Sequence, residues 1–559
     1  MKISVRDGEV CVECANAEYL KLKTSLYLKL REALSVKKSS LHFPLSSFSK
    51  VQHLLSGADL PPEISQIAAA YAGHAVARER ALEIIETGAI QGIQESWAQT
   101  LDPAQAVAVS AMILPNLLGL CLFDEQGSGK TVMTIAAFDA LKSAGLIDAM
   151  IVVCPKSMLS EWPKDIEKFL PNKYKTVIAE GGGSEARQFA VRDFDVLATN
   201  YESVDRMRVA LSATASRKSY LLVVDESFYL KNPDSLRSEV IGKLRDVCKR
   251  CFVLCGTPAP NSPYDLVNQF DLADLGYTFG GFSRTRNTEE DRTRIETLVE
   301  ERGTFVRRLK TDVLGEVPDK NFHIIKVPIS GRQAMMYDKA RSSLELELRG
   351  LDNKSFKKQL VTYFQKRAVL LQICSIPSAV DPTMTEDSAK LVALDKLLAD
   401  LIPQGRKVIL WSFYRKSLDD LAARYAKYLP VRIDGSITSS TERREAVRLF
   451  QEDPTRMLFL GNPAAAGAGI TLHASYDAVY VSYSNQAAHY LQSLDRIHRR
   501  GQKAKEVNYY LLVCEGTIEE TEVIRLRGKE LQQHSLLGDN IAWPTSLDEA
   551  LRELSSVGV

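Results

Sequence analysis

The stretch "FDEQGSGKTVMTIAAF", from Phe123 to Phe138, decides the fold prediction. It follows an apolar run and leads into a segment with helical character, which is the setting of a phosphate-binding loop. Gly127 and Gly129 allow the backbone amides to turn inward around phosphate oxygens, and the start of the following helix adds a favourable dipole. The stretch therefore predicts a buried strand, a nucleotide-binding loop and a helix.

The side chains of this loop indicate how a nucleotide would be held. Lys130 is expected to neutralise the β and γ phosphates, and the Thr131 hydroxyl to ligate Mg²⁺. The strict GxxxxGK[ST] pattern is not met, because Asp124 occupies the first glycine position. The "GSGKT" core between a strand and a helix still favours nucleotide binding over a chance glycine-rich turn. We expect ATP and Mg²⁺ as the ligands, held by the loop residues Gly127, Ser128, Gly129, Lys130 and Thr131.

A second informative stretch is "LLVVDESFYLKNPDS", residues 221–235, in which an apolar run ends in Asp225 and Glu226. Two carboxylates at the end of a buried strand are costly unless they bind a cation. Asp225 is expected to hold Mg²⁺, and Glu226 to orient and deprotonate the attacking water. Because ligands bind at the carboxyl ends of parallel strands, this pair and the phosphate loop are expected at one edge.

From about residue 96 onward, apolar runs alternate with amphipathic segments, which is typical of parallel α/β sheets. Two sets of five runs predict two α/β lobes with a helical connection. The first set is "AMIVVCP", "YKTVIAE", "FDVLATNY", "SYLLVVDE" and "CFVLCGTP", and the second is "KVILWSFY", "VRIDG", "RMLFLGN", "YDAVYVS" and "EVNYYLLV". The predicted divisions are an α+β N-terminal accessory region (1–95), a first lobe (96–275), a helical insertion (276–388), a second lobe (389–530) and a tail (531–559).

Composition narrows the class of protein. The chain has 559 residues, 45% hydrophobic and 25% charged, with a net charge of +1, as expected for a soluble globular protein. The uncharged stretch from residue 106 to 123 is predicted to be a helix, a turn and a buried strand rather than a membrane span. "MKISVRDGEV" has no apolar core of a secretory signal. We expect a cytoplasmic protein, nucleoid-associated if bacterial or viral and nuclear if eukaryotic.

The order of motifs resembles that of superfamily-two helicases, in particular the Swi/Snf-type branch of ATP-driven DNA translocases, in a compact form without chromatin-reading modules. The resemblance covers about residues 100 to 525, and its RR-x-K-x-D-V-L and DR-x-HR-x-GQ elements are specific to this branch. It rests on "LDPAQ" (101–105), "DEQGSGKT", "VVCPKSMLSEW" (152–162), "ATNYE" (198–202), "DESFYLKN", "CGTPAPNSPYDL" (255–266), "VRRLKTDVLGEVPDK" (306–320), "VILWSFY" (408–414), "AGAGITL" (466–472) and "QSLDRIHRRGQ" (492–502).

The resemblance implies two RecA-like lobes with ATP between them, and it assigns roles to matched residues. Gln105 would read adenine. Arg496 and Arg499 would be offered to the γ-phosphate, whereas the sequence alone leaves them evenly between that role and surface charge. The implied catalytic set is Glu226, Asp225, Lys130, Arg496 and Arg499.

The resemblance also implies contacts with the backbone phosphates of duplex or forked DNA, which are independent of base sequence. The matched residues are Lys156, Ser157, Thr199 and Asn200 in the first lobe, and Trp411, Ser412, Gly467 and Gly469 in the second. The linker motif contains Arg307, Arg308 and Lys310. These residues either couple the lobes or contact phosphates, or they are simply the solvated basic face of a helix.

Two positions depart from the family pattern. Phe228 stands where the family usually has a histidine that relays between the acid motif and "GTP", so hydrolysis should survive while coupling to movement is altered. Asn485 stands where the family usually has a DNA-facing tryptophan.

The leading hypothesis is an ATP-dependent translocase on double-stranded DNA that acts in fork remodelling, strand annealing or displacement of bound protein. A strand-separating DNA or RNA helicase is one alternative. A non-hydrolysing ATP-dependent DNA clamp or scaffold is another, and residues 1–95 are a candidate surface for a protein partner.

Overall fold

The structure is a computed structural model, which describes the chain except for residues 7–8, 31–33, 38–39, 45–47, 52–53, 56–59, 181–192, 216, 234, 260–261, 280–281, 283, 286, 310–317, 438, 467–469, 484–486, 500, 532–543, 545 and 556–559. The chain forms two compact units, Met1–Leu309 and Lys310–Val559. Each unit is described by itself.

Unit 1 is built around a seven-stranded sheet in which all strands are parallel. Its central strands are buried on both faces, which explains their continuous runs of Val, Leu, Ile and Cys. In spatial order the strands are β11 (Phe305–Val306), β5 (Gly119–Leu122), β10 (Arg250–Leu254), β9 (Tyr220–Asp225), β6 (Ala149–Cys154), β8 (Val196–Asn200) and β7 (Thr176–Ala179).

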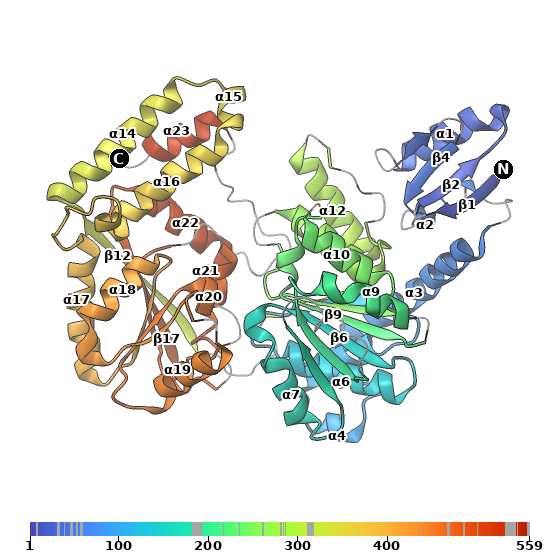
Figure 1. Ribbon diagram of the computed structural model, residues 1–559, viewed down its shortest axis with the longest axis horizontal. Coiled ribbons are helices and arrows are strands. Elements are labelled where there is room, and N and C mark those ends of the chain that lie inside the picture. The colour runs from blue at the N-terminus through green and yellow to red at the C-terminus, as the bar shows by residue number, and fades with distance from the viewer. Residues whose placement is uncertain are drawn as a thin grey trace. The chain divides into compact units, whose positions relative to one another are not determined.

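Helices pack on this sheet and bury its apolar side chains (Figure 1). One large core joins alternate strand residues to several of the helices, and Phe138, Trp162 and Met133 are among its fully buried members. The helices of this lobe are α4 (Glu95–Ala98), α5 (Pro103–Met112), α6 (Lys130–Ser143), α7 (Glu161–Phe169), α9 (Val204–Thr214), α10 (Leu236–Arg245), α11 (Val267–Asp274) and α12 (Thr288–Arg302).

The N-terminal residues of unit 1 form a four-stranded antiparallel sheet with its own small core. Its elements are β1 (Lys2–Arg6), β2 (Glu9–Glu13), α1 (Asn16–Leu30), β3 (Ser35–Lys37), β4 (Ser40–Pro44) and α2 (Phe48–Val51). The predicted hairpin pairs Arg6 with Glu9, and its turn residues 7–8 lie outside the described residues.

The 26-residue helix α3 (Pro62–Thr87) connects this small sheet to the large one (Figure 1). Near its start, Ile64 belongs to the N-terminal core, whereas Ala77, Ala81 and Ile84 belong to the core of the large sheet. The Arg78 guanidinium also donates to the carbonyls of Glu300 and Gly303. The helix is therefore anchored in both cores.

Unit 2 contains a six-stranded parallel sheet. Its strands, in spatial order, are β12 (Asp319–Pro328), β17 (Glu506–Glu515), β16 (Asp477–Tyr480), β13 (Val408–Trp411), β15 (Leu458–Gly461) and β14 (Val431–Ile433). The segment 276–388, for which a helical insertion is predicted, also contains β12, a ten-residue edge strand. Among the described strands β12 pairs with β17 alone, so its half-exposed sequence lacks the apolar run of the inner strands.

The helices of unit 2 fall into two groups. One group flanks the sheet and comprises α17 (Ala389–Leu401), α18 (Arg415–Arg424), α19 (Ser440–Glu452), α20 (Pro463–Ala466), α21 (Ala487–Leu494) and α22 (Ile518–Leu531). The other group lies together in Figure 1 and comprises α14 (Gly331–Arg349), α15 (Asn353–Lys358), α16 (Leu360–Ser375) and α23 (Leu547–Ser555). These helices share an apolar core, to which Cys514 of β17 and Ile518 of α22 also contribute.

The predicted α/β class with two parallel-sheet lobes is confirmed, and each of the ten predicted apolar runs contains a strand. The stretch 106–123 is the end of α5, a turn and β5, as predicted. Within the described part of the chain, every helix is too short or too polar to cross a membrane. The predicted domain boundaries stay predictions. The division between the two units, after Leu309, falls inside the predicted segment 276–388.

Candidate functional site

Three neighbouring strands of unit 1 end level with one another. In the sheet register, Leu254 at the end of β10 pairs with Leu122 of β5 on one side and with Asp225 of β9 on the other. The segments that follow are residues 123–129 (the phosphate loop), residues 226–230 (the acid turn) and residues 255–259 (the β10 loop). The predicted nucleotide-binding residues and the predicted acids therefore meet at one edge of the sheet.

The phosphate loop has the backbone that its glycines allow. Gly127 and Gly129 have φ values of 86° and 91°, in the left-handed region. A Cβ on Gly129 would lie 2.3 Å from Nε2 of Gln105, so only glycine fits there. The Ser128 hydroxyl is buried and has no hydrogen-bond partner among the described residues. An open hydroxyl in a glycine-rich loop at the start of α6 fits a phosphate ligand.

Gln105 is tied to this loop through both ends of its amide. Its Oε1 accepts from the backbone amide of Asp102 at 3.0 Å, and its Nε2 donates to the Ser128 carbonyl at 2.9 Å. These two bonds fix the orientation of the amide and hold α5 (Pro103–Met112) against the loop. The contact between Gln105 and adenine stays a prediction.

Lys130 opens α6, and its side chain folds back over the loop. The ammonium donates to the carbonyls of Asp124 at 2.8 Å and Glu125 at 3.2 Å. These are neutral acceptors, which a phosphate oxygen can replace with a stronger, charge-assisted bond. Thr131 follows on the first turn of the same helix, so the loop and helix bring the predicted lysine and hydroxyl together.

Asp225 is the last residue of β9 and is buried. Its Oδ2 accepts from the indole Nε1 of Trp162 at 3.0 Å, and its Oδ1 accepts from the amide of Glu226 at 2.9 Å. Burial and the negative charge of Glu226 raise the pKa of Asp225 to about 7, while Trp162 and Lys130 oppose the rise. A buried carboxylate with so high a pKa favours a cation partner, as the predicted Mg²⁺ role requires.

Glu226 has an unusual backbone and a specific side-chain partner. Its φ and ψ are 53° and 52°, a left-handed conformation that is strained for a residue other than glycine. Its Oε1 accepts from Nε2 of Gln126, in the phosphate loop, at 2.7 Å. This bond joins the predicted catalytic base directly to the loop that would carry the γ-phosphate.

Arg307 and Arg308 follow β11 and contact the phosphate loop. The Arg308 guanidinium forms a two-pronged ion pair with the fully buried Asp124, with Nε 3.1 Å from Oδ1, and also donates to the Ala104 carbonyl. Arg307 donates to the Phe123 carbonyl at 2.9 Å. Asp124, which replaces the first glycine of the phosphate-loop pattern, thus has a structural role. Its carboxylate binds Arg308 of the linker motif. Lys310 lies outside the described residues.

The predicted DNA-contacting residues of unit 1 differ in accessibility. Lys156 is exposed and pairs with Glu180 at 2.7 Å, and Ser157 is half-buried beside it in a short 3₁₀ turn. Thr199 is buried, and its hydroxyl donates to the Ala179 carbonyl of the next strand. Asn200 is buried with an Oδ1 that has no partner among the described residues. Of these four, only the Lys156 side chain stands well into solvent.

In unit 2, the predicted DNA contacts Trp411 and Ser412 lie inside the protein. The Trp411 indole is fully buried against Gly461, where an added Cβ would lie 2.4 Å from the ring. The Ser412 hydroxyl hydrogen-bonds that of Ser482 at 3.0 Å. These side chains contribute to the core, and their contact with DNA stays a prediction. Gly467 and Gly469 lie outside the described residues, as does Asn485.

Arg496 and Arg499 converge on one carbonyl. Arg496 donates to the carbonyls of Gln492 at 2.8 Å and Ile470 at 2.9 Å, and Arg499 donates to Ile470 at 3.3 Å. Arg496 is buried and Arg499 is half-buried. Unit 2 therefore brings the two predicted arginines together at Ile470, the residue that follows "AGAG" in the sequence.

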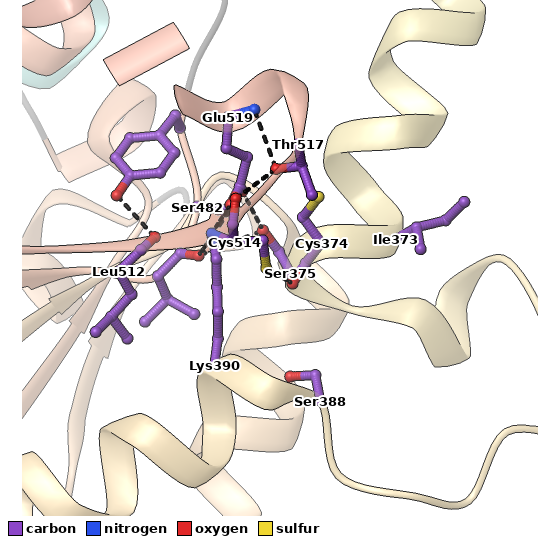
Figure 2. A network of polar contacts seen from close by, with 12 residues as sticks. Ile373, Cys374, Ser375, Ser388, Lys390, Ser482, Leu512, Cys514, Thr517 and Glu519 are labelled. Atoms are coloured by element: carbon purple, nitrogen blue, oxygen red, sulfur yellow. Dashed lines mark hydrogen bonds and ion pairs between the residues drawn. The ribbon is translucent and has the colours of Figure 1, made fainter. Parts of the chain in front are cut away.

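One cluster in unit 2 has the side chains of a metal site. Figure 2 shows Cys374, Cys514 and Glu519 close together and buried. Both carboxylate oxygens are already used, because Lys390 donates to Oε1 at 2.6 Å and the Cys514 amide donates to Oε2 at 2.9 Å. The fully buried ammonium of Lys390 also donates to the Val481 carbonyl at 2.8 Å. The cation of this cluster is thus a lysine, and the network joins α17, the residue that follows β16, β17 and α22.

Sequence reasoning missed three contacts of the unit 1 site. Trp162 lies in a quoted motif, but nothing in its pattern indicated that it would reach Asp225. Gln126 was given no role from the sequence, and Asp124 was noted only as a departure from the glycine pattern. In each case the partner lies at least 63 residues away in sequence, so local patterns carried no signal.

Comparison with known proteins agrees with this architecture. Residues 58–378 match the SNF2-related domain, and residues 389–501 match the helicase conserved C-terminal domain. The human SWI/SNF-related matrix-associated actin-dependent regulator of chromatin subfamily A member 1 is 32% identical over 432 residues, covering 72% of this chain and 40% of the relative. ISWI chromatin-remodeling complex ATPase ISW1 of Saccharomyces cerevisiae is 28% identical over 456 residues, covering 75% of this chain and 39% of the relative.

Among solved structures, the Sulfolobus solfataricus SWI2/SNF2 ATPase core in complex with dsDNA is 22% identical, with a TM-score of 0.37, and covers 82% of this chain and 97% of that one. The chain spans about 40% of the length of the curated relatives it matches. The SNF2-related match alone covers more than half of the residues, and the helicase match follows it directly. The Swi/Snf-type resemblance of the sequence is thereby confirmed, and the chain belongs to the SNF2-related family.

Proposed function

We propose that this protein is a DNA-dependent ATPase that uses ATP hydrolysis to move along or remodel double-stranded DNA. The observation that carries the proposal is the hydrogen bond from Gln126 of the phosphate loop to Glu226. It places a carboxylate beside the loop whose glycines, lysine and open serine hydroxyl suit a nucleoside triphosphate. Relatives named as chromatin-remodeling ATPases support the same activity.

The residues of unit 1 suggest a division of labour. Lys130 would exchange its two carbonyl acceptors for phosphate oxygens, and Glu226 would accept the proton of the attacking water. Thr131 and Asp225 would hold Mg²⁺, which supplies charge neutralisation at the phosphates when bound. Because Asp225 lies directly before Glu226 in the chain, one strand end positions both acids.

Arg496 and Arg499 are proposed to stabilise the charge that develops on the transferred phosphoryl group. In unit 2 both donate to the single carbonyl of Ile470, which holds their guanidinium groups close together. Replacing that carbonyl by phosphate oxygens would give each arginine a charged acceptor. This role would make turnover depend on both units.

DNA binding is proposed to rest on backbone phosphates. Lys156 carries the exposed charge among the predicted contacts, and its present partner Glu180 is itself exposed. An exposed pair of this kind is worth little, so phosphate can displace the glutamate. Affinity for DNA should then fall steeply as salt is added, because each phosphate contact releases counterions.

The test is a parallel measurement of ATP turnover with duplex, single-stranded, forked and RNA ligands. We expect stimulation by duplex and forked DNA and loss of turnover in Glu226→Gln. Turnover of ATP together with displacement of a triplex-forming strand would support translocation. Unwinding of a forked duplex without triplex displacement would favour the strand-separating helicase, and absence of turnover in the intact protein would favour the clamp. The proposed location is the compartment that holds the DNA.

A further inference from the structure

Ser227 directly follows Glu226, and its side chain is fully buried. Its hydroxyl donates to Oε1 of Gln269 on α11 at 2.5 Å. Gln269 is also fully buried, and its Nε2 donates to the carbonyl of Pro258 at 2.6 Å and to that of Asp265 at 2.5 Å. The glutamine amide therefore bridges the acid turn and the β10 loop.

The orientation of this amide is fixed by its partners. Its NH₂ group has two protons, and both face carbonyl oxygens, which can only accept. A flipped amide would place an oxygen against those two carbonyls. The Gln269 oxygen must therefore face Ser227, and the pair cannot be rearranged without losing buried hydrogen bonds.

These contacts close a ring around Glu226. Gln126 donates to the Glu226 carboxylate, and Gly256 of the β10 loop lies so close to Gln126 that an added Cβ would be 2.7 Å from its Cγ. The ring thus runs from the phosphate loop to the acid turn, then through Gln269 to the β10 loop, and back to Gln126. A strained backbone such as that of Glu226 persists only where its surroundings over-determine it.

Phe228 contributes to this region without a polar side chain. Its ring stacks on Tyr229, with the centroids 4.4 Å apart. Burial raises the pKa of the Cys255 thiol to about 12, and hydrogen bonds from the backbone of Thr257 and Phe228 oppose that rise. Among the described residues of the acid turn, the neighbouring Ser227 makes a polar side-chain connection to the β10 loop through Gln269.

We propose that Gln269 is a positioning residue that acts through Ser227, holding Glu226 for ATP hydrolysis and linking its position to that of residues 256–258. The inference rests on the proposed ATPase function. It assigns to a buried helix residue, outside the nucleotide loops, control over the geometry of the catalytic base. Through this bridge, the acid turn and the β10 loop are linked although residue 228 is a phenylalanine.

The experiment compares Gln269→Met and Ser227→Ala with Asn268→Leu as the matched control. Asn268 lies on the same helix and donates to the Leu230 carbonyl of the acid turn, but it is not part of the ring. We expect kcat with saturating DNA to fall about 10- to 100-fold in Gln269→Met and Ser227→Ala, because small misplacements of reacting groups have effects of that size. The KM for ATP should stay within about twofold, and Asn268→Leu should keep most of its turnover.

Urea unfolding of all three variants separates positioning from folding. If turnover falls only in proportion to lost stability, and equally in Asn268→Leu, the inference is overturned. The double variant Ser227→Ala/Gln269→Met should lose no more turnover than Gln269→Met alone, because the bond that Ser227→Ala removes is already absent in Gln269→Met. Additive losses would also overturn the inference. Ser227→Ala removes one oxygen and serves as the test if Gln269→Met does not fold. Absence of turnover in the wild-type protein would instead refute the proposed function itself.

Discussion

The hydrogen bond from Trp162 to Asp225 should set the pH range in which the protein binds magnesium nucleotide. The pKa of Asp225 is raised to about 7 in the protein without ligand. Below that pH a proton occupies the carboxylate that Mg²⁺ needs, so apparent affinity for Mg·ATP should fall about tenfold per pH unit. Between pH 7 and pH 5 the loss should be roughly 50-fold, because half of the carboxylate is already protonated at pH 7.

Trp162→Phe removes the indole donor and should move this profile. A hydrogen bond to a charged group contributes about 1.5–3 kcal/mol, which corresponds to a rise of about one to two units in the pKa of Asp225. The amide of Glu226 still donates to the other oxygen, so the lower end of that range is expected. At pH 7 the variant should bind Mg·ATP about five- to sevenfold more weakly, because half of the wild-type carboxylate is already protonated there, and it should approach the wild type at about pH 9.

The assay is titration of a fluorescent ATP analogue from pH 5.5 to 9, with Mg²⁺ and with EDTA. Trp97→Phe is the matched control, because its indole donates at 2.8 Å to Asp139, another buried aspartate of the same lobe. The control should lose stability but keep the wild-type midpoint. A Trp162→Phe midpoint that is unchanged or lower, or an equal pH dependence in EDTA, would refute the reasoning.

Three further outcomes are expected. Asp225→Asn should abolish turnover but stabilise the nucleotide-free protein above pH 7 by up to about 4 kcal/mol. The pKa of Asp225 is higher in the folded state than in the unfolded state, so ionising this buried acid destabilises the wild type above pH 7, and asparagine cannot ionise. Urea unfolding at pH 4 and pH 8 measures the difference. Arg308→Met should destabilise unit 1 by about 3–5 kcal/mol in urea unfolding, because it leaves the buried Asp124 carboxylate unpaired, and adding Asp124→Asn should recover part of the loss. Lys390→Met should destabilise unit 2 by a similar amount, and the deficit measured by thermal unfolding should shrink at lower pH as the buried Glu519 takes up a proton.

Much of the fold could be predicted because the inner strands of a parallel sheet have a recognisable apolar sequence. Strands such as Ala149–Cys154 and Tyr220–Asp225 are buried on both faces, so the chain must supply an unbroken apolar run. β12 was missed for the converse reason. As an edge strand it mixes Lys, Asn and His with Ile and Val, and Ile324 is 53% exposed. Its strand character comes from pairing with β17, which a local pattern does not reveal.

The site was predictable to the level of motifs and no further. The glycines and acids were identified because their chemistry requires particular residue types at fixed spacing. Whether a side chain points into the core or into solvent depends on its position in the folded sheet. The motifs alone therefore could not show which predicted DNA-contacting side chains are accessible. Trp411 ends a strand whose residues are all buried, and Thr199 occupies a buried position of β8, so their side chains pack inward. Gln269 carried no signal, because its partners are brought to it only by the folded chain.

The helix α3 has a mechanical consequence. A straight helix of 26 residues is about 39 Å long, and both of its ends are anchored in apolar cores rather than in flexible linkers. Such a rod transmits displacement and torque with little slack. Under the proposed function, a molecule bound to the small N-terminal sheet would be displaced or rotated together with the large sheet of unit 1.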